Sequence, residues 1–365
     1  SMASPNMAGA TAVVRQYVRT LHPEFTAREV TDRVWKLTMS TADILTDIDG
    51  VPYTPRKQGA GMVNISSATT ARGYLEVTGT DRVRLNLGDD KEREGVYTLR
   101  FNVVNDCEED LSYNIDLSVF TESVDEIVGT IACKAYLFDG YEYSVSVGNG
   151  SFDDGVITVA AGETASVRIV VVLSDEDKAY MDDNFENGIY VEGFVTLESV
   201  NDVDLSIPFL SYYGNWDEPR VLDGSVYEKD SVALTGNALL GSRVVNNGLF
   251  DTDVQYTLGG YDFYVVPVGY KAPETSADKI ALSYDGKIDT FVVSALRAMR
   301  TLKISLCDAI TGVEYYVVED EGFRKAYVSD SGSLSVLEAQ QKVAVKDFGF
   351  SNNQSLVARY EVTSY

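Results

Sequence analysis

The sequence of 365 residues is poor in the residues on which several common kinds of site depend. It holds one histidine, His22, so any reaction that needs a histidine base has only this candidate within the chain. Its three cysteines, Cys107, Cys133 and Cys307, lie far apart and form no C-x-x-C pair. This spacing argues against a zinc ribbon and against a dithiol redox site.

Basic residues are also scarce, because 30 Lys and Arg stand against 56 Asp and Glu, for a formal net charge of −26. Binding to a phosphate backbone depends on clustered basic side chains, so we expect no nucleic-acid partner. No apolar run approaches the ~18 residues of a membrane span, which predicts no transmembrane segment in this chain. Neither end carries a signal peptide or an anchor, and we expect both ends to be internal to a longer protein.

Two helices are predicted in residues 1–72. The first is indicated by residues at helical spacing and ends before Pro23, which cannot continue it. The second begins at Thr26, which forms an [ST]-x-x-E capping box with Glu29, and continues to about Thr38. No strand is predicted here to cover them, so we expect their apolar faces to be buried by a partner outside this chain. The residues that indicate the helices are Ala8, Ala12, Val13, Tyr17, Val18, Val30, Val34 and Leu37.

The rest of the chain alternates apolar and polar residues, which is typical of strands. Short strands separated by Gly, Asn and Asp clusters predict an antiparallel β-sandwich of fibronectin or immunoglobulin type. We therefore predict a mostly β chain: a helical segment at 1–72, a sandwich at 73–212 and a second β-rich domain at 213–365. The predicted strands are 83–87, 97–105, 113–120, 155–160, 164–173, 193–199, 254–258, 261–270, 279–284, 289–296, 301–308 and 313–320.

The first nine residues, SMASPNMAG, resemble the serine motif of the subtilisin-like serine proteases (subtilases). The matching residues are Ser1, Met2, Ala3, Ser4, Pro5, Ala8 and Gly9, with Asn6 where the family often has His. Two later segments, 40–42 and 59–64, fit the family's order of a T-A segment and a glycine turn after the serine helix. Residues 157–173, 184–199 and 204–216 are similar to the fibronectin-like domain of bacterial cell-envelope proteinases of the lactocepin type.

The resemblance implies a partial α/β subtilisin-fold segment followed by fibronectin-III-like sandwiches. It also implies a secreted, cell-wall-associated serine endopeptidase that forms an acyl-enzyme on Ser1. The family's chain order is Asp, His, Ser. The Asp, the His and the oxyanion Asn are therefore expected from outside this chain, in the N-terminal part of the catalytic domain. The implied substrates are proteins or peptides, and no cofactor is required.

His22 cannot replace the missing base, because a helix over residues 5 to 21 places it roughly 25 Å from Ser1 at ~1.5 Å per residue. A general base has to lie within ~3 Å of the proton that it removes. We therefore expect this chain alone to hydrolyse no peptide bond. At the end of its helix, His22 is interpreted as a surface residue near the helix dipole, with a ligand role as the alternative.

Other interpretations of the first residue stay open. Ser1 and Met2 are also a common remnant of an expression vector, and a free N-terminal serine is the nucleophile of a separate hydrolase class. For the whole chain, the alternative function is a non-catalytic β-sandwich adhesion or binding module that retains a relic protease segment.

Three further groups of residues are candidate sites. Asp285 and Asp289 are the candidate calcium ligands, since Ca²⁺ prefers hard oxygen donors. The acidic clusters are interpreted as solvated loops, with cation binding as the alternative; they are 89–90, 108–110, 175–177 and 182–183. Tyr212, Tyr213 and Trp216 are interpreted as packing between domains, with ligand stacking as the alternative.

Overall fold

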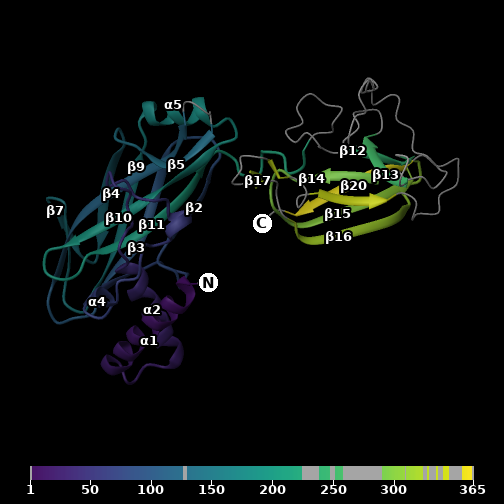
Figure 1. The fold of residues 1–365 in the computed structure, drawn as a ribbon. Coiled ribbons are helices and arrows are strands. Elements are labelled where there is room, and N and C mark those ends of the chain that lie inside the picture. The colour runs from purple at the N-terminus through teal and green to yellow at the C-terminus, as the bar shows by residue number, and fades with distance from the viewer. Residues whose placement is uncertain are drawn as a thin grey trace. The chain divides into compact units, whose positions relative to one another are not determined.

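The computed structural model shows a mostly β chain, as predicted. It divides into two compact units, residues 1–218 and 219–365, and each is described by itself (Figure 1). The residues that the structure describes are 2–125, 130–223, 238–246, 251–257, 290–308, 310–323, 327–328, 334–335, 340–344 and 356–363.

The helices all lie in the first unit as described, and the two predicted at the start of the chain are confirmed. The first ends at its C-cap His22, directly before Pro23, and the second has Thr26 as its N-cap. The five helices are α1 (Ala3–Leu21), α2 (Ala27–Ser40), α3 (Pro55–Gln58), α4 (Ile65–Ala68) and α5 (Asp175–Asn184).

The predicted capping box at the start of α2 is complete. The Thr26 hydroxyl accepts the backbone N–H of Glu29 at 3.4 Å, and the Glu29 carboxylate accepts the backbone N–H of Thr26 at 2.7 Å. These contacts satisfy two of the N–H groups that a helix start leaves without partners. The hydrogen bonds from the Thr26 side chain and backbone lower the pKa of Glu29.

Thr26→Ala is expected to destabilise the first unit by about 1 kcal/mol, because the N-cap acceptor is lost.

The stability that the Glu29 carboxylate contributes to the capping box is expected to depend on pH. Its folded pKa is lowered, so its contribution is present above the ordinary carboxyl pKa and is lost as the pH falls through the folded value. Urea denaturation of Glu29→Gln beside the unchanged protein, from neutral to acid pH, measures this. A stability difference that persists unchanged at low pH would contradict the assignment.

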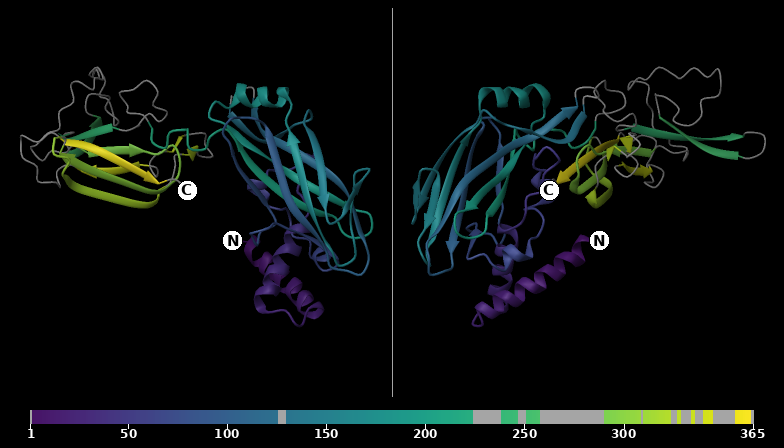
Figure 2. Two further views of the ribbon diagram at one scale, coloured as in Figure 1. Left: turned by 180° about the vertical axis from the view of Figure 1, so that it is seen from behind. Right: turned by 60° about the vertical axis from the view of Figure 1, so that its left-hand side comes forward.

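The body of the first unit is a sandwich of two sheets, with α1 and α2 at one end and α5 at the other (Figures 1 and 2). The four-stranded sheet has the order β1 (Gly73–Glu76), β3 (Val96–Asn105), β9 (Thr164–Val172) and β6 (Glu142–Gly148). The seven-stranded sheet has the order β2 (Leu85–Asp90), β11 (Leu205–Tyr213), β10 (Ile189–Ser199), β4 (Leu111–Asp125), β8 (Val156–Val159) and β7 (Ser151–Asp153), and β5 (Thr130–Leu137) pairs with β4.

Alternating side chains fill the space between these two sheets. Along β3 every second residue is buried, and the same alternation holds along β9. This period follows from the pleat, which sends successive side chains to opposite faces. The largest fully buried side chains of this core include Tyr113, Tyr213, Phe209, Leu99 and Ile169.

Three of the four acidic clusters are not in loops, and the prediction is wrong for them. Asp89 and Asp90 are the last two residues of β2. Both 175–177 and 182–183 belong to α5, whose N-cap Ser174 accepts the backbone N–H of Asp177 at 3.0 Å. Acidic side chains in a first helical turn interact favourably with the helix dipole, so the same cluster that resembles a loop also starts a helix. Asp177 is itself buried, at 3% exposure, and its carboxylate accepts a hydrogen bond from the Ser174 hydroxyl at 2.8 Å.

The expectation that the helical segment needs an outside partner to cover its apolar faces is wrong in part. The inner faces of α1 and α2 pack on each other and on the sandwich, around Tyr74 of β1 and Val104 of β3. Helices α2 and α3 also contact β11, on the outer face of the seven-stranded sheet. The shared apolar cluster consists of Val14, Val18, Val30, Val34, Leu37, Ala68, Ala71 and Tyr74.

The second unit contains further antiparallel sheets. The core side chains described there are Ala295, Met299, Leu302 and Ile304. The predicted strands at 261–270 and 279–284 lie outside the described residues. Its strands are β12 (Ala238–Asn246), β13 (Asp251–Thr257), β14 (Thr290–Ser294), β15 (Met299–Asp308), β16 (Glu314–Phe323), β17 (Tyr327–Val328), β18 (Leu334–Ser335), β19 (Gln340–Ala344) and β20 (Leu356–Thr363).

Candidate functional site

The first candidate site is the start of α1, which carries the SMASP sequence. Ser1 lies outside the described residues, as do the calcium candidates Asp285 and Asp289. Met2 is the N-cap of α1, makes no capping hydrogen bond through its side chain and is 84% exposed. The small residues that follow are also exposed: Ala3, Ser4, Ala8, Gly9 and Ala12. The first part of α1, up to Ala12, thus exposes mostly small side chains.

The single histidine lies at the opposite end of the same helix. The 19 residues of α1 separate Met2 from His22, a span of roughly 29 Å at ~1.5 Å per residue. The His22 imidazole lies 3.4 Å from the carboxylates of Glu24 and Asp106, and its ring stacks on Phe25 at 4.3 Å between centroids. His22 therefore holds the end of the helix to the sandwich loop, and it is too far from the helix start to act as a base there.

The glycine turn at 59–64 has a clear physical requirement. Gly61 has φ +127°, and a Cβ at this position would lie 2.3 Å from the carbonyl oxygen of Asp43. The backbones of Asp43 and Met62 exchange two hydrogen bonds, each 2.8 Å long. The Asn64 side-chain amide donates to the Asp43 carboxylate. Asn64 also caps α4 by accepting the backbone N–H of Ser67 at 3.0 Å. Only glycine fits this crossing of two backbones.

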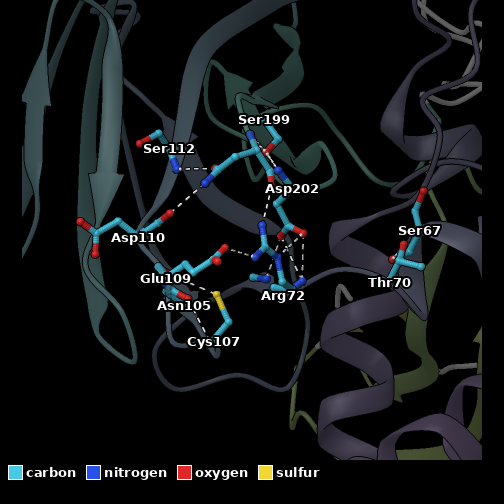
Figure 3. A network of polar contacts seen from close by, with 12 residues as sticks. Ser67, Thr70, Arg72, Asn105, Cys107, Glu109, Asp110, Ser112, Ser199 and Asp202 are labelled. Atoms are coloured by element: carbon cyan, nitrogen blue, oxygen red, sulfur yellow. Dashed lines mark hydrogen bonds and ion pairs between the residues drawn. The ribbon is translucent and has the colours of Figure 1, made fainter.

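Arg72 is the centre of a polar network that joins the helical segment to the sandwich (Figure 3). Its guanidinium donates to the Glu109 carboxylate at 2.6 Å and to the carbonyl of Asn201. The Asp202 carboxylate, which is 4% exposed, accepts the backbone N–H groups of both Arg72 and Gly73 at 3.0 Å. The hydrogen bond to Glu109 raises the pKa of Arg72.

The loop between β3 and β4 completes this network. The Asn105 side-chain amide donates to the carbonyls of Glu109 and Val159 at 2.7 and 3.0 Å, and its oxygen accepts the N–H of Cys107 at 3.0 Å. On the other side, Asn201 donates to the carbonyl of Asp110 at 2.9 Å. These groups hydrogen-bond to one another, so the network fixes a junction. Cys107 is a free thiol within it, and its sulfur donates to the carbonyl of Glu109 at 3.3 Å.

A second junction lies on the outer face of the seven-stranded sheet. Glu192 of β10 has a side chain with 0% exposure, and it accepts from the Arg56 guanidinium at 2.9 and 3.2 Å. The Thr54 hydroxyl donates to the same carboxylate at 2.8 Å, and Arg56 also contacts Glu122 at 2.8 Å. Burial alone would lower the pKa of Arg56, but the hydrogen bonds and charges of the two glutamates raise it.

The aromatic residues at the end of β11 pack within the first unit. Trp216 meets Tyr212 at 4.9 Å and Tyr190 at 5.6 Å between ring centroids, and Arg56 lies 4.3 Å above Tyr190. Tyr213 donates its hydroxyl to Asp182 at 3.3 Å. The rings of Tyr190, Tyr212 and Trp216 therefore adjoin the Arg56 junction through the contact between Arg56 and Tyr190.

Among the residues that the structure describes, no group of three or more His, Cys, Asp and Glu side chains is arranged to hold a metal ion. None of the helices described is long and apolar enough to cross a membrane.

Comparison with known proteins agrees with the sandwich and with a relation to bacterial proteinases. Residues 85–210 match the Fn3-like domain family. The PI-type proteinase of Lactococcus lactis subsp. cremoris is 25% identical over 358 residues, which cover 92% of this chain and 17% of that protein. The C5a peptidase of Streptococcus pyogenes serotype M1 is 27% identical over 283 residues, which cover 76% of this chain and 22% of that protein. The chain is a homologue of these proteinases.

The chain spans less than a quarter of the length of these two relatives, since it covers 17% and 22% of them. Solved structures match more distantly, among them a PapD-like domain of human CEP192 with 8% identity, a TM-score of 0.25 and coverage of 39% of this chain and 85% of that chain. At that level the likeness supports no functional argument. The relation to proteinases therefore rests on the sequence matches.

The two junctions were not predicted from sequence as junctions, although Glu109 and Asp110 of the Arg72 network belong to the acidic cluster 108–110. Arg56 and Glu192 are 136 residues apart, and Arg72 and Asp202 are 130 apart, so no local spacing marks them as partners. The one available signal is a charged residue inside an apolar strand, since Glu192 stands between Val191 and Phe194.

Proposed function

We propose that this chain is part of a secreted, cell-envelope serine endopeptidase of the subtilisin-like class, with Ser1 as its nucleophile. Residues 1–72 are the last segment of the catalytic domain, and residues 73–212 and 213–365 are fibronectin-like domains that follow it. The observation that carries the proposal is the order of features. The SMASP sequence leads into α1, the Gly61 turn follows, and the Fn3-like match at 85–210 comes next, in a homologue of two bacterial proteinases.

In this proposal the chemistry is shared between this chain and residues outside it. The Ser1 hydroxyl attacks the scissile carbonyl while a histidine takes its proton, and the same histidine then protonates the leaving amine. His22 cannot be that base, because it stands at the far end of α1 and contacts Glu24 and Asp106. The Asp, the His and the oxyanion Asn come from an N-terminal part of the catalytic domain, which packs on the exposed small residues of α1. The sandwich then lies beside the catalytic centre and shapes the access of protein substrates.

The 365-residue chain alone is expected to hydrolyse no peptide bond, because its nucleophile has no base. The same chain extended by the coding sequence ahead of Ser1 is expected to cleave a protein substrate and to react with a serine-directed fluorophosphonate. Both activities are expected to vanish in Ser1→Ala. Ser4→Ala is the matched control, since Ser4 lies exposed in the same motif and is expected to leave the activity unchanged.

Hydrolysis by the 365-residue chain that disappears with Ser1→Ala would overturn the assignment of an outside base. An extended protein that folds and yet shows no hydrolysis, and no reaction of Ser1 with the fluorophosphonate, would favour the non-catalytic binding module.

A further inference from the structure

Two arginines face each other on the exposed side of the four-stranded sheet. Arg100 of β3 and Arg168 of β9 are directly opposite in the antiparallel register, and both are exposed. Directly opposed residues have Cβ atoms about 5 Å apart, and like charges in this position oppose strand pairing. The fold therefore holds two positive charges together on one sheet face.

The chain around this pair is strongly acidic, with a net charge of −26. Several cations of the first unit contact carboxylates, namely Arg33, Lys36, Arg56, Arg72 and Arg93. Neither the Arg100 nor the Arg168 guanidinium forms an ion pair or hydrogen bond with any residue that the structure describes.

The side chains around the two arginines are mostly polar or apolar without charge. Both arginines line one shallow hollow of about 360 Å³. Ser146 of β6 lies opposite Arg168 in the register, and its hydroxyl donates to the backbone carbonyl of Arg168 at 3.4 Å. Glu76 of β1 is the acidic residue beside the hollow, where its carboxylate accepts from the Asn102 amide at 3.3 Å and pairs with Lys36 at 2.9 Å. The residues that line the hollow with the two arginines are Val77, Thr78, Phe101, Asn102, Ser166 and Val167, and none of these described residues is acidic.

We propose that Arg100 and Arg168 form a binding site for a phosphoryl group, either inorganic phosphate or a phosphate monoester. A guanidinium binds an oxyanion through two parallel N–H groups, so two opposed guanidiniums suit an anion with oxygens on more than one side. A phosphate monoester carries about −1.5 to −2 charges at pH 7 and three acceptor oxygens. A carboxylate has a single charge and two oxygens, and it would neutralise only one arginine. Binding of the phosphoryl group removes the repulsion between the two side chains.

Calorimetric titration of the 365-residue chain with sodium phosphate tests the site, with sodium chloride at equal ionic strength as the reference. We expect saturable binding that Arg100→Gln and Arg168→Gln each weaken about 10- to 100-fold, through the loss of charge-assisted hydrogen bonds. Arg84→Gln is the matched control, because Arg84 is exposed and also has no ion pair among the described residues. The Arg84→Gln variant is expected to bind phosphate with the same affinity as the unchanged chain.

Thermal unfolding adds a readout that a merely structural role would not give. Without phosphate, both variants are expected to unfold at the same temperature as the unchanged chain or higher, since the like-charge contact is gone. With phosphate, only the unchanged chain and Arg84→Gln are expected to gain stability. O-phosphoserine in place of phosphate distinguishes a monoester site, if it binds more tightly, from a site for the free ion. No saturable binding of either compound, or equal binding by all variants, would overturn the proposal.

Discussion

Gly193→Ala is expected to prevent the first unit from folding stably. Gly193 lies in the middle of β10, which pairs with β4 on one side and β11 on the other. A Cβ at this position would lie 1.9 Å from the carbonyl oxygen of Ser118 and 2.7 Å from the Phe209 ring. Real Cβ atoms do not approach backbone this closely, so the two strands would have to separate. We expect a loss of about 4 kcal/mol or more, out of roughly 5–15 kcal/mol for a typical domain.

Soluble yield and urea denaturation followed by circular dichroism measure this loss. Gly9→Ala is the control, because it makes the same chemical change in α1, where a Cβ meets nothing within 4 Å. Replacing a glycine inside a helix by alanine is expected to add about 0.5–1 kcal/mol. The two variants thus change stability in opposite directions. A Gly193→Ala protein as stable as the unchanged chain would mean that β4 and β10 do not pair in this register.

The parts of the fold that the sequence predicts well are those set by local residues. Pro23 ends one helix, and Thr26 with Glu29 begins the next, so both boundaries follow from a few neighbouring residues. The long strands of the sandwich follow from their period of two. Helix α5 was missed because its charged residues hide any apolar stripe, although Ser174 followed by Asp177 is a capping signal.

The burial of the helical segment could not be predicted, because it depends on contacts between distant parts of the chain. Tyr74 and Val104 cover the inner faces of α1 and α2, and only the folded sandwich brings them there. The nucleophile is a different case. Ser1 is singled out by a family motif, since a serine before a helix has no physical property that marks it as reactive without its base.

Arg56→Gln is expected to destabilise the first unit by about 3–5 kcal/mol, because it leaves a buried carboxylate without its cation. The Glu192 side chain has 0% exposure and would keep only the Thr54 hydroxyl as a partner at 2.8 Å. Arg56→Lys is expected to lose part of this stability as well. A lysine keeps the charge but cannot donate the two fork-shaped hydrogen bonds that Arg56 makes at 2.9 and 3.2 Å.

Combining Arg56→Gln with Glu192→Gln decides whether the buried charge is the cause. If it is, the double variant is expected to recover much of the stability, since two amides can hydrogen-bond without a charge to compensate. Urea denaturation of the two single variants and the double variant gives the coupling energy directly.

Arg82→Gln is the surface control, because Arg82 forms an ion pair at 3.5 Å with the exposed Asp81. Loss of this ion pair is expected to cost less than about 1 kcal/mol. Additive losses from Arg56 and Glu192 would show that the arginine acts through packing on Tyr190, where it lies 4.3 Å from the ring centroid. Strong coupling would instead show that the Arg56–Glu192 ion pair itself attaches the segment of residues 1–72 to the sandwich, beside the Arg72 network.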